Sequence, residues 1–232
     1  MARLTSITKK DQVAAKDQPV FDSIVASRGA VQGPFTMFLH SPELAGRLAH
    51  LGAYVRFEGS LDMRVRVLAA MTVARELEAV YVWGAQTGGA RRLGVPESTI
   101  TAIRENHSRG IPPEDAQIVD FTRQLMRKHR VDEATVKALI GRFGNDGFIQ
   151  LTGAIGYYAM LAMTVNACEL EAAPGAEVLK ALLLRMPRVM PSSDRTRGAS
   201  GCAPARLTPS GLSTVIRLIE TLPDPGCARE VE

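Results

Sequence analysis

Cysteine, aromatic residues and long uncharged apolar runs are all scarce in this chain of 232 residues. Its 3 cysteines are Cys168, Cys202 and Cys227, and no two of them form a C-x-x-C pair. This odd, scattered set argues against a disulfide framework and against a dithiol redox site. Aromatic residues make up only 5% of the chain, while alanine and leucine are plentiful. This composition disfavours a β-sandwich and favours packed helices.

Strong charge and metal-ligand spacing are missing as well. The formal net charge is +4, and short basic clusters such as Arg91-Arg92 are more typical of solvated helix ends than of nucleic-acid sites. The 4 histidines lack metal-ligand spacing, so we predict no metal and no other cofactor. The N-terminus has no apolar signal core, and no stretch reaches the roughly 18 uncharged apolar residues of a membrane span. We expect a cytoplasmic protein that binds neither nucleic acid nor membrane.

Helical periodicity is the main pattern that the chain does contain. One apolar stripe with steps of three or four runs through 60–83 and comprises Val67, Met71, Ala74, Leu77 and Tyr81. Asp132 is the expected N-cap of a later helix that ends at Gly144. The segment 145–171 is almost wholly apolar, which predicts a central helix buried on most sides. No stretch alternates with a period of two, so we predict an all-α fold.

The composition divides the chain into three parts. Residues 1–15 are polar and are expected to form an N-terminal arm. Residues 16–185 hold the helical segments and are predicted to form one domain. Residues 186–232 are rich in Pro, Ser, Gly and Arg, which predicts a flexible tail with one short helix at most, near 212–223.

Two quoted segments carry a family resemblance. They are FDSIVASRGAVQGPFTMFLHSPELAGRLAHLGAYVRFEGSL (21–61) and DMRVRVLAAMTVARELEAVYVWGAQTGGARRLGV (62–95). The first resembles the opening, and the second the core helical hairpin, of carboxymuconolactone decarboxylase-like proteins, the superfamily that includes alkylhydroperoxidase AhpD. Residues 116–144 and 151–176 resemble its second half. The resemblance implies an AhpD-like helical bundle built around the hairpin, and a homo-oligomer (dimer, trimer or hexamer) assembled through it.

The peroxidase branch of this family carries C-x-x-C-x-x-x-H with a glutamate upstream. Histidine and glutamate relay protons there and lower the pKa of one thiol, whose thiolate attacks the peroxide. A second branch lacks the cysteines and commonly has Y-E-W with a histidine following. Tyr81 and Trp83 match the aromatic pair of that second pattern. The functional positions then fall on Val67 (glutamate), Ala79 and Val82 (cysteines) and Gln86 (histidine).

These replacements define the candidate site. Gln86 can donate and accept hydrogen bonds but cannot shuttle protons near neutral pH. We predict Gln86, Tyr81 and Glu76 as catalytic residues, although ion pairing is the alternative role for Glu76. The pocket is predicted to include Val67, Ala79, Val82, Trp83 and Tyr157. Core or interface packing is the alternative for Tyr81, Trp83 and Tyr157, and close packing is the favoured explanation of Gly88-Gly89.

Three functions are consistent with this sequence. The first is a small-molecule enzyme of the lyase or decarboxylase type, acting on a small organic acid, a lactone or a similar compound without a thiol. The second is the peroxiredoxin-type (alkylhydroperoxidase) activity that the family label implies, which the replaced cysteines argue against. The third is a non-catalytic, oligomeric protein that binds a small molecule on the inherited fold.

Overall fold

The computed structural model describes residues 2–172 and 174–179, and every regular element in these ranges is helical. This confirms the all-α prediction. The tail predicted at 186–232, with its short helix, lies outside the described residues. The elements are η1 (Lys10–Gln12), η2 (Ala15–Asp17), α1 (Gln18–Arg28), α2 (Pro34–Phe38), α3 (Pro42–Ala53), the π-helical turn η3 (Tyr54–Glu58), α4 (Met63–Glu76), α5 (Val80–Arg92), α6 (Glu97–Arg104), α7 (Pro113–Lys128) and α8 (Glu133–Ala167).

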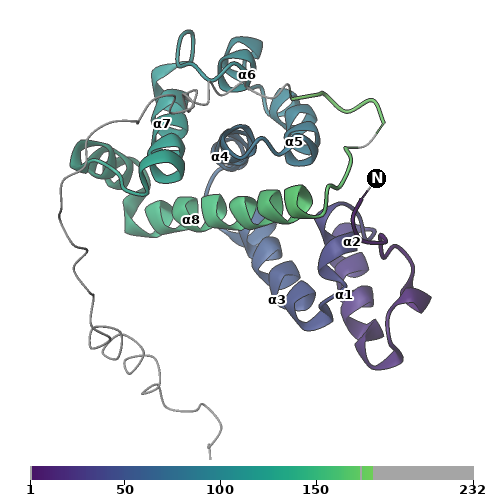
Figure 1. Cartoon of the computed structure of the whole chain (residues 1–232). Coiled ribbons are helices and arrows are strands. Elements are labelled where there is room, and N and C mark those ends of the chain that lie inside the picture. The colour runs from purple at the N-terminus through teal and green to yellow at the C-terminus, as the bar shows by residue number, and fades with distance from the viewer. Residues whose placement is uncertain (1, 173, 180–232) are drawn as a thin grey trace, which may run out of the picture. The chain divides into compact units, whose positions relative to one another are not determined.

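Helix α4 is the centre of the bundle. It packs against α5, α7 and α8, while α1 packs against α3 on the other side of α8 (Figure 1). Every residue of α4 from Val67 to Arg75 is buried. The sequence predicted this central position for 145–171 instead, and that prediction is wrong. Segment 145–171 is almost wholly apolar, so its hydropathy alone does not show which side of the helix is exposed.

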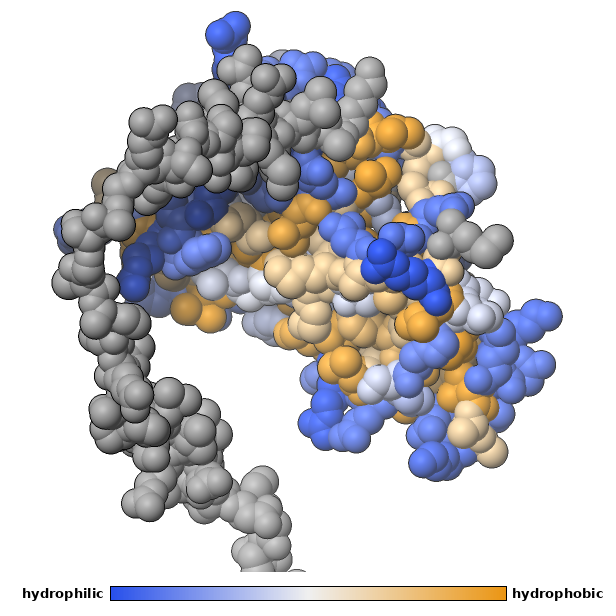
Figure 2. All heavy atoms as spheres, in the orientation of Figure 1, coloured by the Kyte–Doolittle hydropathy of each residue, from blue (hydrophilic) through white to orange (hydrophobic). Residues whose placement is uncertain are grey.

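Helix α8 buries one side and exposes the other. Ile149 and Met163 are 65% and 57% exposed, and apolar residues gather over the middle of the face shown in Figure 2. Among the described helices, α8 alone has the length and hydropathy for crossing a membrane, and 44% of the relevant window is buried. Core helices pass the same test, so this composition is weak evidence of a membrane span.

Helices α4 and α5 are separated by a tight break at residues 77–79. Glu78 adopts a left-handed conformation (φ 52°), and the Ala79 N–H donates to the Ala74 carbonyl at 2.8 Å. The Leu77 carbonyl accepts from the Asn166 side chain of α8 at 2.7 Å. The apolar stripe predicted through Tyr81 is therefore two helices, because the chain reverses just after Leu77. This is the hairpin that the resemblance implies.

The later helix boundaries follow the sequence signals. The Asp132 carboxylate accepts from the Thr135 N–H at 2.8 Å, which confirms the predicted N-cap. Gly144 has φ 68° and ψ 177°, so α8 is two helices joined at the residue where the sequence predicts a helix end. Only glycine adopts this conformation readily.

Both chain segments outside the bundle helices are attached to it. In the N-terminal arm, Ile7 and Val13 are buried, and the Arg3 N–H donates to the Cys168 carbonyl at 2.8 Å. The segment 174–179 crosses α5 on its way to the buried Leu179. Glu177 of this segment pairs with Arg91 at 2.8 Å and with Arg104 at 3.1 Å.

Candidate functional site

The predicted hairpin borders a pocket region with two adjacent cavities that share part of their lining. The first has a volume of about 260 Å³ and lies among the segment before α2, α5 and α8. We call it the tyrosine lobe, because Tyr81, Tyr157 and Tyr158 all line it. The second has a volume of about 180 Å³, and we call it the arginine lobe, because Arg56, Arg66 and Arg92 line it. The two lobes share Arg56, Ala85, Gln86 and Tyr158.

Positive charge dominates both lobes. Arg28 and Arg56 line the tyrosine lobe, and Arg56, Arg66 and Arg92 line the arginine lobe. Neither lining contains an aspartate, glutamate, histidine, cysteine or lysine. Within the described part of the chain, the side chains of Arg56 and Arg92 form no hydrogen bond or ion pair; the Arg56 guanidinium lies over the Phe57 ring at 4.8 Å. Because no carboxylate neutralises these guanidinium groups, the pocket is suited to an anion.

Backbone carbonyls hold the other two arginines in place. Arg28 donates to the Ala49 carbonyl at 2.9 Å, and Arg66 donates to the Val55 carbonyl at 2.7 Å. The Nε atoms of both side chains are buried without a hydrogen-bond partner among the described residues. A neutral carbonyl orients a guanidinium without cancelling its charge, so these side chains stay available to attract a negative ligand.

Glycines make room for two of the tyrosines. The Tyr157 hydroxyl lies beside Gly52 of α3, where an added Cβ would clash with it. The Tyr81 hydroxyl lies in the same way against Gly33, whose φ of 58° also favours glycine. Burial raises the pKa of Tyr157, while the adjoining Arg28 guanidinium acts in the opposite direction. Burial likewise raises the pKa of Tyr81. Both phenols are neutral near pH 7 and can donate a hydrogen bond to a ligand.

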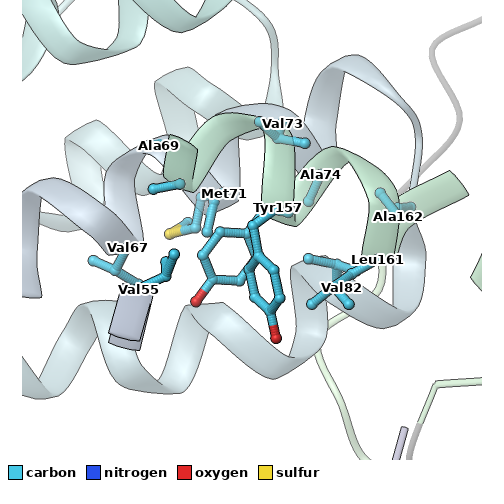
Figure 3. Close-up of a cluster of buried hydrophobic side chains, with 14 of the residues drawn as sticks. Val55, Val67, Ala69, Met71, Val73, Ala74, Val82, Tyr157, Leu161 and Ala162 are labelled. Atoms are coloured by element: carbon cyan, nitrogen blue, oxygen red, sulfur yellow. The ribbon is translucent and has the colours of Figure 1, made fainter. Parts of the chain in front are cut away.

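The structure brings five of the predicted residues to the pocket. Tyr81, Val82, Gln86 and Tyr157 line the tyrosine lobe, and Gln86 lines the arginine lobe together with Val67. Figure 3 shows Tyr157 extending from α8 among Val55, Val67, Val82 and Leu161. Val67, Val82 and Gln86 are three of the four positions that the resemblance associates with thiol chemistry. All three thus line the two lobes, and their side chains here are aliphatic or amide.

The other three predicted residues lie elsewhere. Ala79 is fully buried at the start of α5 and lines neither lobe. Trp83 is also fully buried, and its Nε1 has no hydrogen-bond partner among the described residues. Glu76 accepts from Arg127 at 2.6 Å on the α7 side of the bundle, which matches its alternative role in ion pairing. The structure therefore does not bring Glu76 or Trp83 to the pocket.

Sequence reasoning missed the four arginines of the pocket. Arg92 lies on α5 one turn beyond Gly89 and two turns beyond Ala85, so it is on a face beside that of Val82 and Gln86, and extending their face does not reach it. Arg66 directly precedes Val67, but adjacent residues of a helix do not share a face, so Val67 did not point to it. Arg28 and Arg56 come from other elements, and no spacing in the sequence joins them to the hairpin.

Comparisons with known proteins agree with this architecture. Residues 42–107 match the model of the Carboxymuconolactone decarboxylase family. No curated protein gives a significant match. The fold is similar to the AhpD core of an uncharacterized peroxidase-related protein from Ralstonia eutropha JMP134, with 15% identity, a TM-score of 0.62, and coverage of 75% of this chain and 93% of that one.

Two further solved structures share the fold. An alanine variant of the debrominase Bmp8, in complex with 2,3,4-tribromopyrrole, is 17% identical with a TM-score of 0.59, covering 75% of this chain and 95% of that one. A peroxidase-related protein from Silicibacter sp. TM1040 is 14% identical with a TM-score of 0.59, covering 75% and 92%. The family match thus covers the segment that contains the α4–α5 hairpin, and the solved structures show that the chain has an AhpD-like helical fold.

Proposed function

We propose that this protein is a carboxymuconolactone decarboxylase-like enzyme of the lyase or decarboxylase type, acting on a small organic anion. The observation that carries the proposal is a pocket with four arginines and no carboxylate in its lining. Guanidinium groups bind carboxylates through paired, charge-assisted hydrogen bonds. The same fixed charges stabilise the negative charge that develops on a substrate when carbon dioxide leaves or a lactone opens.

Individual side chains have distinct roles in this proposal. Arg56 belongs to both lobes and binds the anionic group of the substrate. Gln86 also belongs to both lobes and orients the substrate, since it has no hydrogen-bond partner within the described residues. Tyr81 donates a hydrogen bond from its neutral phenol. The proposal gives no role to Glu76, whose carboxylate Arg127 already holds.

The lining argues against thiol-dependent peroxide reduction. Val67, Val82 and Gln86 cannot form a thiolate or relay a proton. Cys168 follows the end of α8 and lines neither lobe. Cys202 and Cys227 lie outside the described residues. We therefore expect hydrogen peroxide turnover in the presence of dithiothreitol to equal the protein-free background, and turnover that Cys168→Ala abolishes would contradict this.

The test is a screen of β-keto acids and carboxylated lactones for carbon dioxide release by the full chain. Arg56→Gln should lower kcat/KM of any converted acid about tenfold, because it removes one unpaired charge from both lobes. Arg130→Gln is the matched control, since Arg130 is exposed and lines neither lobe. Tight binding without conversion would support the non-catalytic alternative. Conversion that is insensitive to Arg56→Gln would contradict the assigned site.

We also propose a homo-oligomer, as the family resemblance implies. The exposed apolar side chains of α8, Ile149 and Met163, are consistent with a surface that a second copy covers. Sedimentation velocity of the full chain measures the assembly directly. A monomer at all protein concentrations would contradict the proposal.

A further inference from the structure

Tyr158 stands between the two lobes of the pocket. It is one of the four residues that line both, with Arg56, Ala85 and Gln86. Arginine stays protonated in proteins, and alanine and glutamine do not titrate. Tyr158 is therefore the only residue of this shared set that can give a proton to a ligand and take it back.

The position of Tyr158 is fixed, but its hydroxyl is not engaged. The residue is 6% exposed, and its ring packs edge-on against Tyr157 with 5.4 Å between centroids. The Tyr157 hydroxyl is held against Gly52 and Arg28. In contrast, the Tyr158 hydroxyl forms no hydrogen bond with any residue that the structure describes. Although the ring is buried, the hydroxyl is reached by solvent through the pocket, so a ligand in either lobe can accept a hydrogen bond from it.

The charges around Tyr158 suit reversible proton release. Burial raises the pKa of its phenol, and the neighbouring Tyr157 raises it further. Near pH 7 the group therefore carries its proton. The guanidinium groups of Arg56 and Arg66 act in the opposite direction and favour the phenolate. The phenol is thus a stable donor at rest, and two neighbouring guanidinium groups stabilise the anion that it becomes.

We propose that Tyr158 is the catalytic acid of this pocket. The inference rests on the proposed decarboxylase-type function. As the bond to the departing carboxylate breaks, its electron pair stays on the substrate and carbon dioxide leaves. The Tyr158 O–H then transfers its proton to the carbon, or to the conjugated oxygen, that holds this pair. A proton from water converts the resulting tyrosinate back to the phenol, so the cycle is balanced without an oxidant or a cofactor.

The experiment uses 4-nitrophenolate as a probe, because its oxyanion resembles the charge that develops in this step. Binding to the full chain at pH 8 is followed by absorbance, and 4-nitroanisole is the neutral ligand of the same shape. Tyr158→Phe should weaken the phenolate about tenfold or more, which is the usual loss for a hydrogen bond to a charged group. Tyr54→Phe is the matched control, because Tyr54 is exposed and lines neither lobe.

The neutral ligand separates a proton donor from a packing residue. Tyr158→Phe should leave 4-nitroanisole affinity unchanged, whereas equal weakening of both ligands would mean that Tyr158 only shapes the pocket. If Tyr158→Phe melts early, 3-fluorotyrosine is instead placed at position 158 alone, where its more acidic phenol should bind 4-nitrophenolate more tightly. Unchanged affinity there contradicts the proposal.

The arginine variant distinguishes this inference from the proposed function. Arg56→Gln could weaken the binding of 4-nitrophenolate while Tyr158→Phe does not. That result would contradict the role of Tyr158 but would still support an anion-binding pocket. A wild-type protein that does not prefer 4-nitrophenolate to 4-nitroanisole would overturn the anion pocket, and the catalytic acid with it.

Discussion

Two regions of this protein are rich in arginine, and they use it in opposite ways. Along α4 and α7, Asp115 accepts two hydrogen bonds from Arg64, at 2.7 and 3.2 Å, and Glu76 is paired with Arg127 at 2.6 Å. In the pocket, no carboxylate lines the space around Arg56 and Arg92. Pairing cancels the field of a guanidinium, whereas an unpaired one attracts a ligand.

The comparison teaches that the carboxylates, more than the arginines, locate the site. We call the ion pairs along α4 and α7 the helix seam. There the side chains of Asp115 and Glu76 are only 3% and 8% exposed. Their removal would leave Arg64 and Arg127 without a carboxylate partner. In the pocket, Arg56 and Arg92 are exposed and have no ionic partner, so solvent hydrates them until an anion binds. Four changes test this contrast, in order of decreasing effect.

Glu76→Gln should give the largest effect. It leaves Arg127 and the largely buried Arg123 without their carboxylate, which lies 3.7 Å from the Arg123 Nε. We expect the free energy of unfolding to fall by about 3 kcal/mol, the lower part of the range for breaking a buried pair, because Arg127 is 45% exposed. Urea unfolding followed by circular dichroism measures this. A loss below about 1 kcal/mol would show that the seam contributes little.

Gln86→Glu should make the pocket resemble the seam. A carboxylate between the two lobes would neutralise the neighbouring arginines and repel a bound anion. We expect the dissociation constant of 4-nitrophenolate to rise about thirtyfold, or about 2 kcal/mol, with the melting temperature retained. Gln117→Glu on α7 makes the same chemical change outside the pocket and should leave binding unaltered. Equal effects of the two variants would refute the contrast.

Alkaline pH should lower the free energy of unfolding through the tyrosines of the pocket rather than through the ion pairs of the helix seam. Burial raises the pKa of Tyr81, Tyr157 and Tyr158. Above the ordinary tyrosine value of about 10, the unfolded chain therefore releases protons that the folded chain retains. The free energy of unfolding should be level below about pH 10, and fall above it by about 1 kcal/mol per pH unit for each tyrosine. Urea titrations from pH 8 to 11 test this, and Tyr158→Phe should reduce the slope.

Glu43→Gln should give the smallest effect and calibrates the first prediction. Glu43 pairs with Arg47 one turn along α3 at 2.7 Å, but the two side chains are 81% and 77% exposed. Solvent screens such a pair, so we expect a loss below about 0.5 kcal/mol by the same urea assay. A loss comparable to that of Glu76→Gln would mean that burial is not what separates the two ion pairs.

Local signals predicted the fold well where one residue type decides the outcome. Asp132 caps a helix because its carboxylate accepts a backbone N–H, and Gly144 interrupts one because its conformation excludes other residues. The sequence pattern did not reveal the break after Leu77. Leu77 and Tyr81 are four residues apart, which is the spacing of one helical face whether or not the helix is interrupted between them. The left-handed Glu78 is an uncommon choice for that position. The side chain of Asn166 that supports the break comes from a distant helix.

The candidate site was predictable along α4 and α5 and at Tyr157 of α8. The family positions at Val67, Val82 and Gln86 fall on the two helices of one hairpin, so their spacing was enough to bring them together. Arg28 and Arg56 join them through tertiary packing, which no sequence interval records. Glu76 has a carboxylate that could replace the lost proton chemistry, and it was predicted for that reason, but this carboxylate pairs with Arg127 away from the pocket.

The segment 174–179 has a practical consequence for shortened versions of this protein. The Cβ of Ala176 lies 2.9 Å from where a side chain on Gly84 would begin, and Glu177 holds both Arg91 and Arg104. A truncation before residue 174 would therefore uncover the back of the helix that carries Gln86. The earliest safe boundary for a truncated protein or an affinity tag lies after Leu179, which is itself buried in the bundle.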